Sequence, residues 1–293
     1  MAVETTTFSN NSADTWFRDI MFDCVLCPRA CHVNRLAGQT GYCGQTAELM
    51  AARASLHYWE EPCISGTSGS GTVFFSGCNL RCVFCQNHNI ALGKAGRVIA
   101  PEHLAEIFLQ LQEQGANNIN LVTPTHFLPQ IVIALEQAKQ QGLHLPIVYN
   151  TGSYESPEAL RHLEGLVDIY LPDLKYFSPE LSTAYSHAPD YFETACAAIS
   201  EMYRQVGDPV IDEDTGLMQH GMIVRHLLLP GQTKDSKKIL RYLHETYGDH
   251  IYISIMNQYT PLPQVADIKA LNRTVTPEEY DRVLRFAERI GIE

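Results

Sequence analysis

Three cysteines follow the first predicted strand at a spacing that suits a metal cluster. Cys78, Cys82 and Cys85 form a C-x3-C-x2-C pattern directly after the apolar residues 72–75. Three thiolates can bind three irons of a [4Fe–4S] cubane and leave its fourth iron without a protein ligand. An open coordination position separates a catalytic metal site from a closed structural one. The pattern therefore predicts a catalytic iron–sulfur cluster; the alternatives are a zinc loop and three incidental buried cysteines.

A second group of cysteines lies nearer the N-terminus, in a stretch with little apolar periodicity. Its members are Cys24, Cys27, Cys31 and Cys43. Four thiolates can close the shell of a structural zinc or hold a second iron–sulfur cluster, and the spacing fits either. Metal bonds would then supply the order that apolar packing lacks. His32 and Cys63 are substitute ligands, and burial of redox-inert thiols is the alternative to metal binding.

Composition narrows the class of protein. The chain has 293 residues and a formal net charge of −12, which argues against nucleic acid or an anionic membrane as the main partner. It lacks both a run of about 18 apolar residues, which a membrane span needs, and the basic start and apolar core of a signal peptide. Eight of its nine cysteines lie within residues 24–85. We therefore expect a cytoplasmic protein with clustered metal-binding thiols.

Apolar runs and helical periodicity alternate after residue 71. The predicted strands are residues 72–75, 119–123, 146–151, 167–174, 222–229 and 251–256. Helices are predicted between them, including a long one over 179–206, and a last helix begins at a capping box, Thr276 to Glu279. Six strand–helix units predict an α/β fold, a partial (β/α)6 TIM-type barrel with its chemistry at the carboxyl ends of the strands.

The glycine- and serine-rich residues 66–71 suggest a division of the chain. We expect a small Cys-rich N-terminal extension over residues 1–66 and a catalytic core with a C-terminal helix over 67–293. The alternative is that residues 66–71 are only a loop that leads into the next strand. A long proline-containing loop, residues 258–273, is typical of a lid or a partner surface.

The C-x3-C-x2-C segment resembles the signature of the radical S-adenosylmethionine (SAM) superfamily. The resemblance implies that the amino and carboxylate groups of SAM bind the open iron. It also implies that one electron cleaves SAM to methionine and a 5′-deoxyadenosyl radical, which abstracts hydrogen from a substrate. Within that superfamily, residues 20–260 look most like an uncharacterised branch related to pyruvate formate-lyase activase, an activating enzyme of glycyl radical proteins.

The resemblance extends to polar residues at the ends of predicted strands. It implies that SAM lies near Asn150 and Thr151 after the third strand, Asp173 and Lys175 after the fourth, and Arg225 in the fifth. Each of these residues offers donors or charge for a zwitterionic ligand. The alternatives are that Asp173 and Lys175 are solvated and that Arg225 pairs with a structural carboxylate.

One segment departs from the activase pattern. Activases usually carry Gly-Gly-Glu after the second strand, whereas this chain has Val-Thr-Pro-Thr-His at residues 122–126. Thr123 or backbone carbonyls would then accept the hydrogen bonds of the SAM amino group. His126 is either a proton or hydrogen-bond partner at the site or a structural residue. The departure weakens any transfer of substrate identity from activases.

The leading prediction is therefore an activase-like radical SAM enzyme. The resemblance implies a glycyl radical enzyme as protein substrate and an electron donor such as flavodoxin or ferredoxin. One alternative is a radical enzyme that modifies a small molecule or another peptide. A second is a non-catalytic iron–sulfur electron carrier, which needs neither an open cluster nor polar strand ends.

Overall fold

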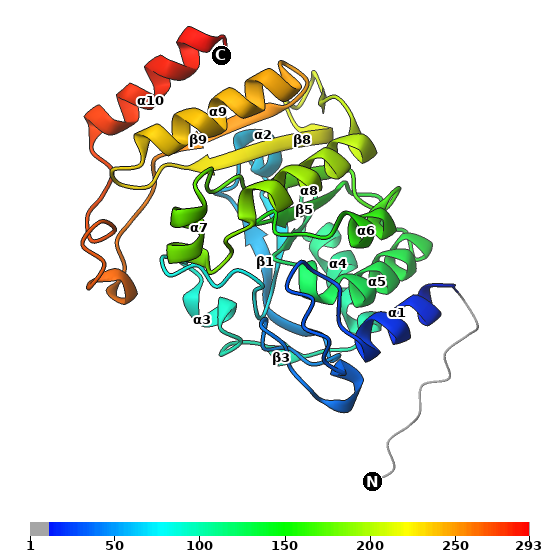
Figure 1. The fold of residues 1–293 in the computed structure, drawn as a ribbon. Coiled ribbons are helices and arrows are strands. Elements are labelled where there is room, and N and C mark those ends of the chain that lie inside the picture. The colour runs from blue at the N-terminus through cyan, green and yellow to red at the C-terminus, as the bar shows by residue number, and fades with distance from the viewer. Residues whose placement is uncertain (1–11, 293) are drawn as a thin grey trace.

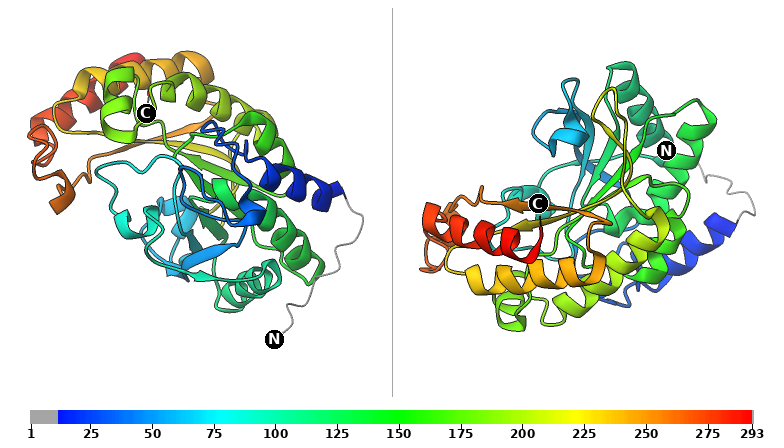
Figure 2. Two further views of the ribbon diagram at one scale, coloured as in Figure 1. Left: turned by 60° about the horizontal axis from the view of Figure 1, so that its bottom comes forward. Right: turned by 90° about the horizontal axis from the view of Figure 1, so that it is seen from above.

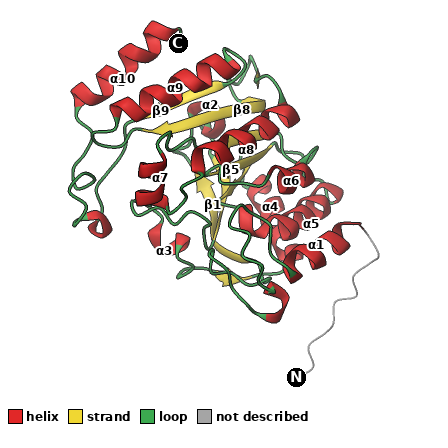
Figure 3. Cartoon of the chain, viewed as in Figure 1, coloured by secondary structure: helices red, strands yellow, loops and turns green. Residues whose placement is uncertain are grey.

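The computed structural model describes residues 12–292, and nine strands of this part form one sheet (Figures 1 and 3). The strands are β1 Met50–His57, β2 Ser70–Phe75, β3 Arg97–Val98, β4 Ile119–Val122, β5 Ile147–Thr151, β6 Ile169–Pro172, β7 Val210–Ile211, β8 Met218–Leu227 and β9 Tyr252–Met256. The first eleven residues of the predicted N-terminal extension lie outside the described residues.

Six of these strands are parallel neighbours in the order β2-β4-β5-β6-β8-β9. They correspond to the six predicted strands, and helices cover their outer face (Figure 2). The sheet path runs from β3 to β7, with β9 paired to β8 beside it, and within residues 12–292 no pairing joins β9 back to β2 or β3. The predicted partial (β/α)6 barrel is therefore confirmed as an open one. None of the described helices is long and apolar enough to cross a membrane.

The helices follow the predicted periodicity with one difference. They are α1 Ser12–Phe22, α2 Pro62–Ser65, α3 His88–Ala91, α4 Pro101–Glu113, α5 Leu128–Gln140, α6 Pro157–Leu160, α7 Pro179–Ser186, α8 Tyr191–Val206, α9 Thr233–Tyr247 and α10 Pro277–Ile290. The single long helix predicted over 179–206 is wrong, because the chain breaks between α7 and α8. His187 there has a left-handed backbone (φ 52°), and Pro189 cannot donate the N–H that a continuous helix needs. The capping box at Thr276 and Glu279 is confirmed.

The two faces of the sheet bury different residues. The outer face packs against the helices in the main core, to which Ile119, Leu121 and Tyr149 belong. The inner face, which lines the lumen of the barrel, carries a second apolar cluster that includes Val148 and Leu171. Ile64 of α2 joins this second cluster and closes the lumen at the amino ends of the strands. Because side chains alternate along a strand, residues two positions from Val148 and Leu171 also face the lumen.

The N-terminal segment is tied to the barrel by packing as well as by a strand. β1 pairs antiparallel with β2, with Ala54 opposite Val73. Arg35 is only 1% exposed and donates to the carbonyl of His126 at 2.7 Å. Leu26 belongs to the main core. The expectation that this segment lacks apolar packing is therefore wrong, because its apolar residues are spread singly instead of periodically. The boundary at residue 66 stays a prediction.

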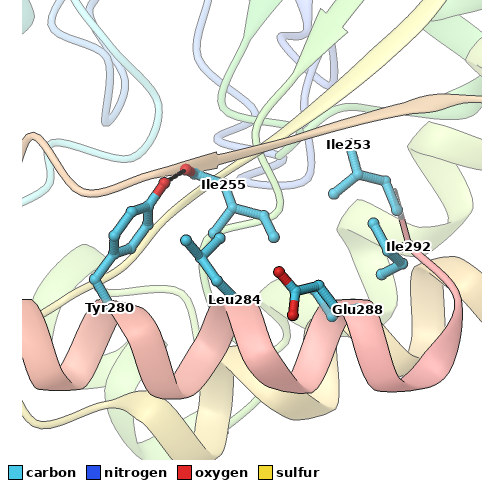
Figure 4. Close-up of a pocket in the computed structure, with 7 residues that line it drawn as sticks. Ile253, Ile255, Tyr280, Leu284, Glu288 and Ile292 are labelled. Carbon is cyan, nitrogen blue, oxygen red and sulfur yellow. Dashed lines mark hydrogen bonds between the residues drawn. The ribbon is translucent and has the colours of Figure 1, made fainter.

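An apolar pocket of about 380 Å³ lies between β9 and α10 (Figure 4). Ile253, Ile255 and Leu284 line it, and the Tyr280 hydroxyl donates to the carbonyl of Ile255 at 2.9 Å beside it. Ile253 and Ile255 pack on the cluster that α9 and α10 form, on the outer face of the sheet. The pocket therefore lies on the opposite face of β9 from the lumen and is separate from the predicted site.

Candidate functional site

The loop after β2 carries the three cysteines of the C-x3-C-x2-C pattern. Cys82 is buried, whereas Cys78 and Cys85 are half-buried. The Ser186 hydroxyl donates to Cys82 Sγ at 2.9 Å, and the backbone N–H of Leu80 donates to Cys78 Sγ at 3.4 Å. Burial, and then repulsion from the neighbouring thiols, raises the pKa of Cys78 and raises that of Cys85 to about 12. Crowded thiols of this kind suit a cationic cluster, which would hold them as thiolates.

Two segments from the C-terminal half support this loop. The N–H of Val83 donates to the carbonyl of Tyr185 at 2.9 Å. Gln264 Nε2, in the loop over residues 258–273, donates to the carbonyl of Cys85 at 3.1 Å. Phe84 packs edge to face against Tyr259 of the same loop, with ring centroids 6.0 Å apart. The loop over residues 258–273 therefore contacts the cysteine loop directly.

Four of the polar residues predicted at strand ends meet in one network. Arg225 Nε donates to Asp173 Oδ1 at 2.9 Å, and Arg225 Nη2 donates to Asn150 Oδ1 at 2.7 Å. Lys175 Nζ donates to Asp173 Oδ2 at 2.5 Å. The alternation of side chains places Asn150 and Asp173 on the lumen face, two residues beyond Val148 and Leu171. The network therefore faces the lumen at the carboxyl ends of β5, β6 and β8.

The network is held in its charged form. Burial alone would raise the pKa of Asp173, but Arg225 and Lys175 outweigh it and hold the pKa below its ordinary value. Burial would lower the pKa of Lys175, yet Asp173 and the thiol of Cys82 raise it above its ordinary value. Lys175 also lies beside the cysteine loop, since a Cβ at Gly152 would lie 2.8 Å from Leu80 Cδ1 and 3.4 Å from Lys175 Cε. Charged donors and acceptors thus stand beside the thiols.

Glu60 belongs to this network and was missed by sequence reasoning. Its Oε2 accepts from Arg225 Nη1 at 3.1 Å, and its Oε1 accepts from Asn150 Nδ2 at 3.4 Å. Glu60 follows β1 and enters the lumen next to α2. One signal was available: the predicted set held two buried cations, Arg225 and Lys175, but only one anion, and buried charges are normally paired.

The two predicted threonines lie differently. The Thr151 hydroxyl donates to Glu155, on the opposite face of β5 from Asn150, so Thr151 does not join the network. Thr123 follows β4 and donates its N–H to the carbonyl of Asn150 at 2.9 Å. Its φ of 56° is strained for a β-branched residue. The role of both threonines toward a cofactor stays a prediction.

His126 is buried away from the network. Its Nε2 donates to the carbonyl of Ser76 at 2.6 Å, and its own carbonyl accepts from Arg35. Burial lowers the pKa of His126 to about 3, so the ring is neutral at physiological pH. These contacts favour the structural interpretation of His126. Nearby, Glu155 accepts from Thr125 at 2.6 Å, and burial raises its pKa to about 7.

The N-terminal cysteines gather around a tight turn. The N–H of Tyr42 donates to Cys31 Sγ at 3.3 Å, and a Cβ at Gly41 would lie 2.7 Å from the same sulfur. Burial is the main cause that raises the pKa values of Cys27 (to about 12) and Cys43, and neighbouring thiols add to it. Of the substitute ligands, His32 bonds to Asp23 at 2.9 Å and Cys63 packs on the lumen cluster at α2.

No three His, Cys, Asp or Glu side chains within residues 12–292 converge closely enough to hold a single metal ion. A zinc site needs such convergence, because its ligands share one ion. A cubane does not, because its thiolates bind separate irons. Metal binding by the N-terminal group stays a prediction.

Comparison with known proteins adds a family and several relatives. Residues 72–243 match the family model described as the Radical SAM superfamily. The chain is 27% identical to the uncharacterized protein MJ0674 of Methanocaldococcus jannaschii, over 94% of this chain and 77% of that protein. It is 29% identical to the pyruvate formate-lyase-activating enzyme of Clostridium pasteurianum, over 39% of this chain and 48% of that enzyme.

Two solved structures are distantly similar. One is HydG, a maturase of the [FeFe]-hydrogenase, at 14% identity and a TM-score of 0.49 over 73% of this chain and 48% of that one. The other is anSMEcpe with bound AdoMet and the Cp18Cys peptide, at 13% identity and a TM-score of 0.46 over 72% of this chain and 56% of that one. The chain thus spans about half the length of both structures.

His126 makes the stability of the protein depend on pH. Its folded pKa of about 3 lies below the ordinary value of 6.5, so the unfolded chain binds a proton that the folded chain excludes. Stability from this residue is therefore present above pH 6.5 and is lost as the pH falls toward 3. Between pH 7 and pH 5, we expect the unfolding free energy of His126→Gln to fall by about 2 kcal/mol less than that of the wild type.

The measurement is urea unfolding of both proteins at a series of pH values. His144→Gln, at an exposed position, is the control and should follow the wild type. Parallel pH profiles for wild type and His126→Gln would contradict the prediction.

Proposed function

This chain belongs to the radical SAM superfamily, and on that premise we propose that it abstracts a hydrogen atom from a glycine of a partner protein. Superfamily members bind a [4Fe–4S] cluster and SAM and cleave SAM through a radical. The observation that carries the SAM-binding part of the proposal is the position of a charged, buried network beside the C-x3-C-x2-C loop. An electron carrier needs no such network, so we disfavour that class.

We propose that Cys78, Cys82 and Cys85 bind three irons of the cluster. The crowded, half-buried thiols and the hydrogen bonds to their sulfurs fit this role. When bound, the cluster supplies the electron that cleaves SAM. Ser153 Oγ and Arg81 Nε, on the loops after β5 and β2, are buried without a hydrogen-bond partner among the described residues, as expected beside a ligand site.

The network residues would bind the methionine end of SAM. Lys175 and Arg225 offer charged N–H donors to its carboxylate, and Asp173 offers acceptors to its ammonium group. Asn150 holds Arg225 from the side at 2.7 Å. Because these side chains are already paired with one another in the barrel, they are held in place before SAM arrives. Thr123 is proposed as a further contact, and so is the backbone of Thr151, whose side chain faces Glu155.

The choice of a glycyl radical protein rests on the likeness to pyruvate formate-lyase-activating enzyme, which covers only part of each chain. A radical enzyme of this kind also needs an electron donor, such as flavodoxin or ferredoxin, to reduce its cluster. We place the reaction in the cytoplasm. The second candidate is the same chemistry on a small molecule or another peptide. The sequence at residues 122–126, which lacks the activase Gly-Gly-Glu, favours this second candidate.

The first test is formation of 5′-deoxyadenosine by the reconstituted, reduced protein. We expect wild type to form it and each of the variants Cys78→Ala, Cys82→Ala and Cys85→Ala to form none, because two thiolates do not retain the cluster. Cys196→Ala, outside the pattern, is the control and should retain activity. Addition of a glycyl radical protein should then give a glycyl radical signal in electron paramagnetic resonance. Cleavage of SAM without any such signal would favour the second candidate.

The second test concerns Lys175. Lys175→Met keeps the apolar stem and removes the charge, so we expect SAM affinity to fall about tenfold while iron content is unchanged. Equilibrium dialysis with labelled SAM measures the affinity, and Lys234→Met, at an exposed position on α9, is the control. Equal affinity of Lys175→Met and wild type would remove Lys175 from the proposed site.

The third test concerns the N-terminal cysteines, which we propose hold a second metal centre. A triple variant with alanine at positions 78, 82 and 85 lacks the first cluster, so any remaining metal reports on Cys24, Cys27, Cys31 and Cys43. About four irons with sulfide per chain would indicate a second cluster, and about one zinc a structural site. If the triple variant is folded but metal-free, and the N-terminal thiols can be replaced in the wild type without loss of activity, the proposal is wrong.

A further inference from the structure

Asn120 is a buried amide that the proposed function does not use. It is fully buried, and neither its Nδ2 nor its Oδ1 has a hydrogen-bond partner among the described residues. Its neighbours along β4, Ile119 and Leu121, belong to the outer core, so the side chain of Asn120 faces the lumen. An unpaired buried amide destabilises the fold, and a bound partner would recover that cost.

Asn120 lies directly below the charged network. It is in register with Thr72 of β2 and Val148 of β5, whereas Asn150 lies two residues further along β5 on the same face. Glu60 reaches Asn150 from the lumen side with a contact of 3.4 Å, which is long for a hydrogen bond. The Asn150 amide therefore retains capacity for a better acceptor. Ile64 closes the lumen beneath this level.

The charges around this level select the chemistry of a ligand. Glu60 and Arg225 are paired with each other, so their charges offset one another and neither is left over for a charged ligand. A carboxylate would also leave the Asn120 carbonyl without a donor, and an ammonium group would leave the Asn120 NH₂ group without an acceptor. A neutral amide carries one donor and one acceptor side by side and can satisfy both ends of the Asn120 carboxamide.

We infer that the lumen between Asn120 and Glu60 binds an amide group of the substrate. The inference rests on the proposed function for the identity of the reaction. What it adds is the chemical group by which the substrate is positioned beside SAM. A peptide bond and the carboxamide of a small molecule share this chemistry. Glu60 and Asn150 then face the same amide from the level above, so the bound group is held from both sides.

The experiment uses the cluster-loaded enzyme with SAM and measures binding of small probes by saturation-transfer NMR. The probes propionamide, propionate and propylammonium have similar size and differ in charge. We expect propionamide to bind at least tenfold more tightly than the other two. Equal or tighter binding of propionate or propylammonium would overturn the inference. N-acetylglycine N-methylamide and propionamide then distinguish a peptide group from a primary carboxamide as the preferred ligand.

A substitution separates binding from folding. Asn120→Leu keeps the number and branching of the side-chain heavy atoms and removes both polar atoms, so we expect propionamide binding to fall at least tenfold with SAM affinity unchanged. Thermal stability should be equal to or above that of wild type, because an unpaired buried amide is lost. Asn257→Leu, at an exposed position after β9, is the control. Undiminished propionamide binding by Asn120→Leu, or loss of stability in this variant, would assign Asn120 a structural role and overturn the inference.

The same samples keep the two proposals apart. N-acetylglycine N-methylamide deuterated at the glycine carbon loses one deuterium atom when that C–D bond breaks, and 5′-deoxyadenosine gains it as a new C–D bond. Deuterium in 5′-deoxyadenosine supports glycine as the reacting residue. If SAM is cleaved and the 5′-deoxyadenosine contains no deuterium, the result counts against the proposed function. Probe binding decides the amide site separately, whichever result the deuterium gives.

Discussion

The ion pair between Arg225 and Asp173 is the contact on which the candidate site depends. It joins the carboxyl ends of β8 and β6, where the backbone also forms a bridge, with the N–H of Leu174 donating to the carbonyl of Arg225 at 2.9 Å. Arg225 further binds Asn150 of β5 and Glu60 after β1, so one guanidinium links three strands and the N-terminal segment. Burying these charges is costly unless every one is paired. Because these charges are paired, the side chains of the network need to move little when a zwitterionic ligand binds.

The cysteine loop is supported from two remote parts of the chain. Arg29 from the N-terminal segment donates to the carbonyl of Asn79 at 2.8 Å, and its guanidinium stacks over Tyr42 at 3.9 Å. The Tyr42 hydroxyl donates in turn to the carbonyl of Leu80 at 3.3 Å. On the other side, Gln264 holds the carbonyl of Cys85. A change in either segment would therefore reach the thiols through one or two contacts. This arrangement gives the N-terminal cysteines a physical route to influence the proposed cluster.

Three of the six non-glycine residues with a left-handed backbone in residues 12–292 lie at the same end of the barrel. Arg81, Thr123 and Ser153 have φ values of 51°, 56° and 64°, although none is glycine. They follow β2, β4 and β5, at the carboxyl ends where the network and the cysteine loop meet. Such conformations cost of order 1–3 kcal/mol each and persist only where the surroundings hold them. The strained positions thus mark the same region as the thiols and the charged network, by an independent criterion.

The sequence alone determined what depends on local spacing. The C-x3-C-x2-C pattern, the six strands with their alternation and the capping box at Thr276 are set within a few residues of chain, and the family and barrel predicted from them are confirmed. The resemblance implied Asn150, Asp173, Lys175 and Arg225 as a set, and all four come from strand ends, which meet at one edge of a parallel sheet. Only the tertiary structure decided which carboxylate completes their charge, since Glu60 and Arg225 lie 165 positions apart. It also turned Thr151 toward Glu155 and left Asn120 unpaired in the lumen, because the direction and surroundings of a side chain depend on how distant strands pack.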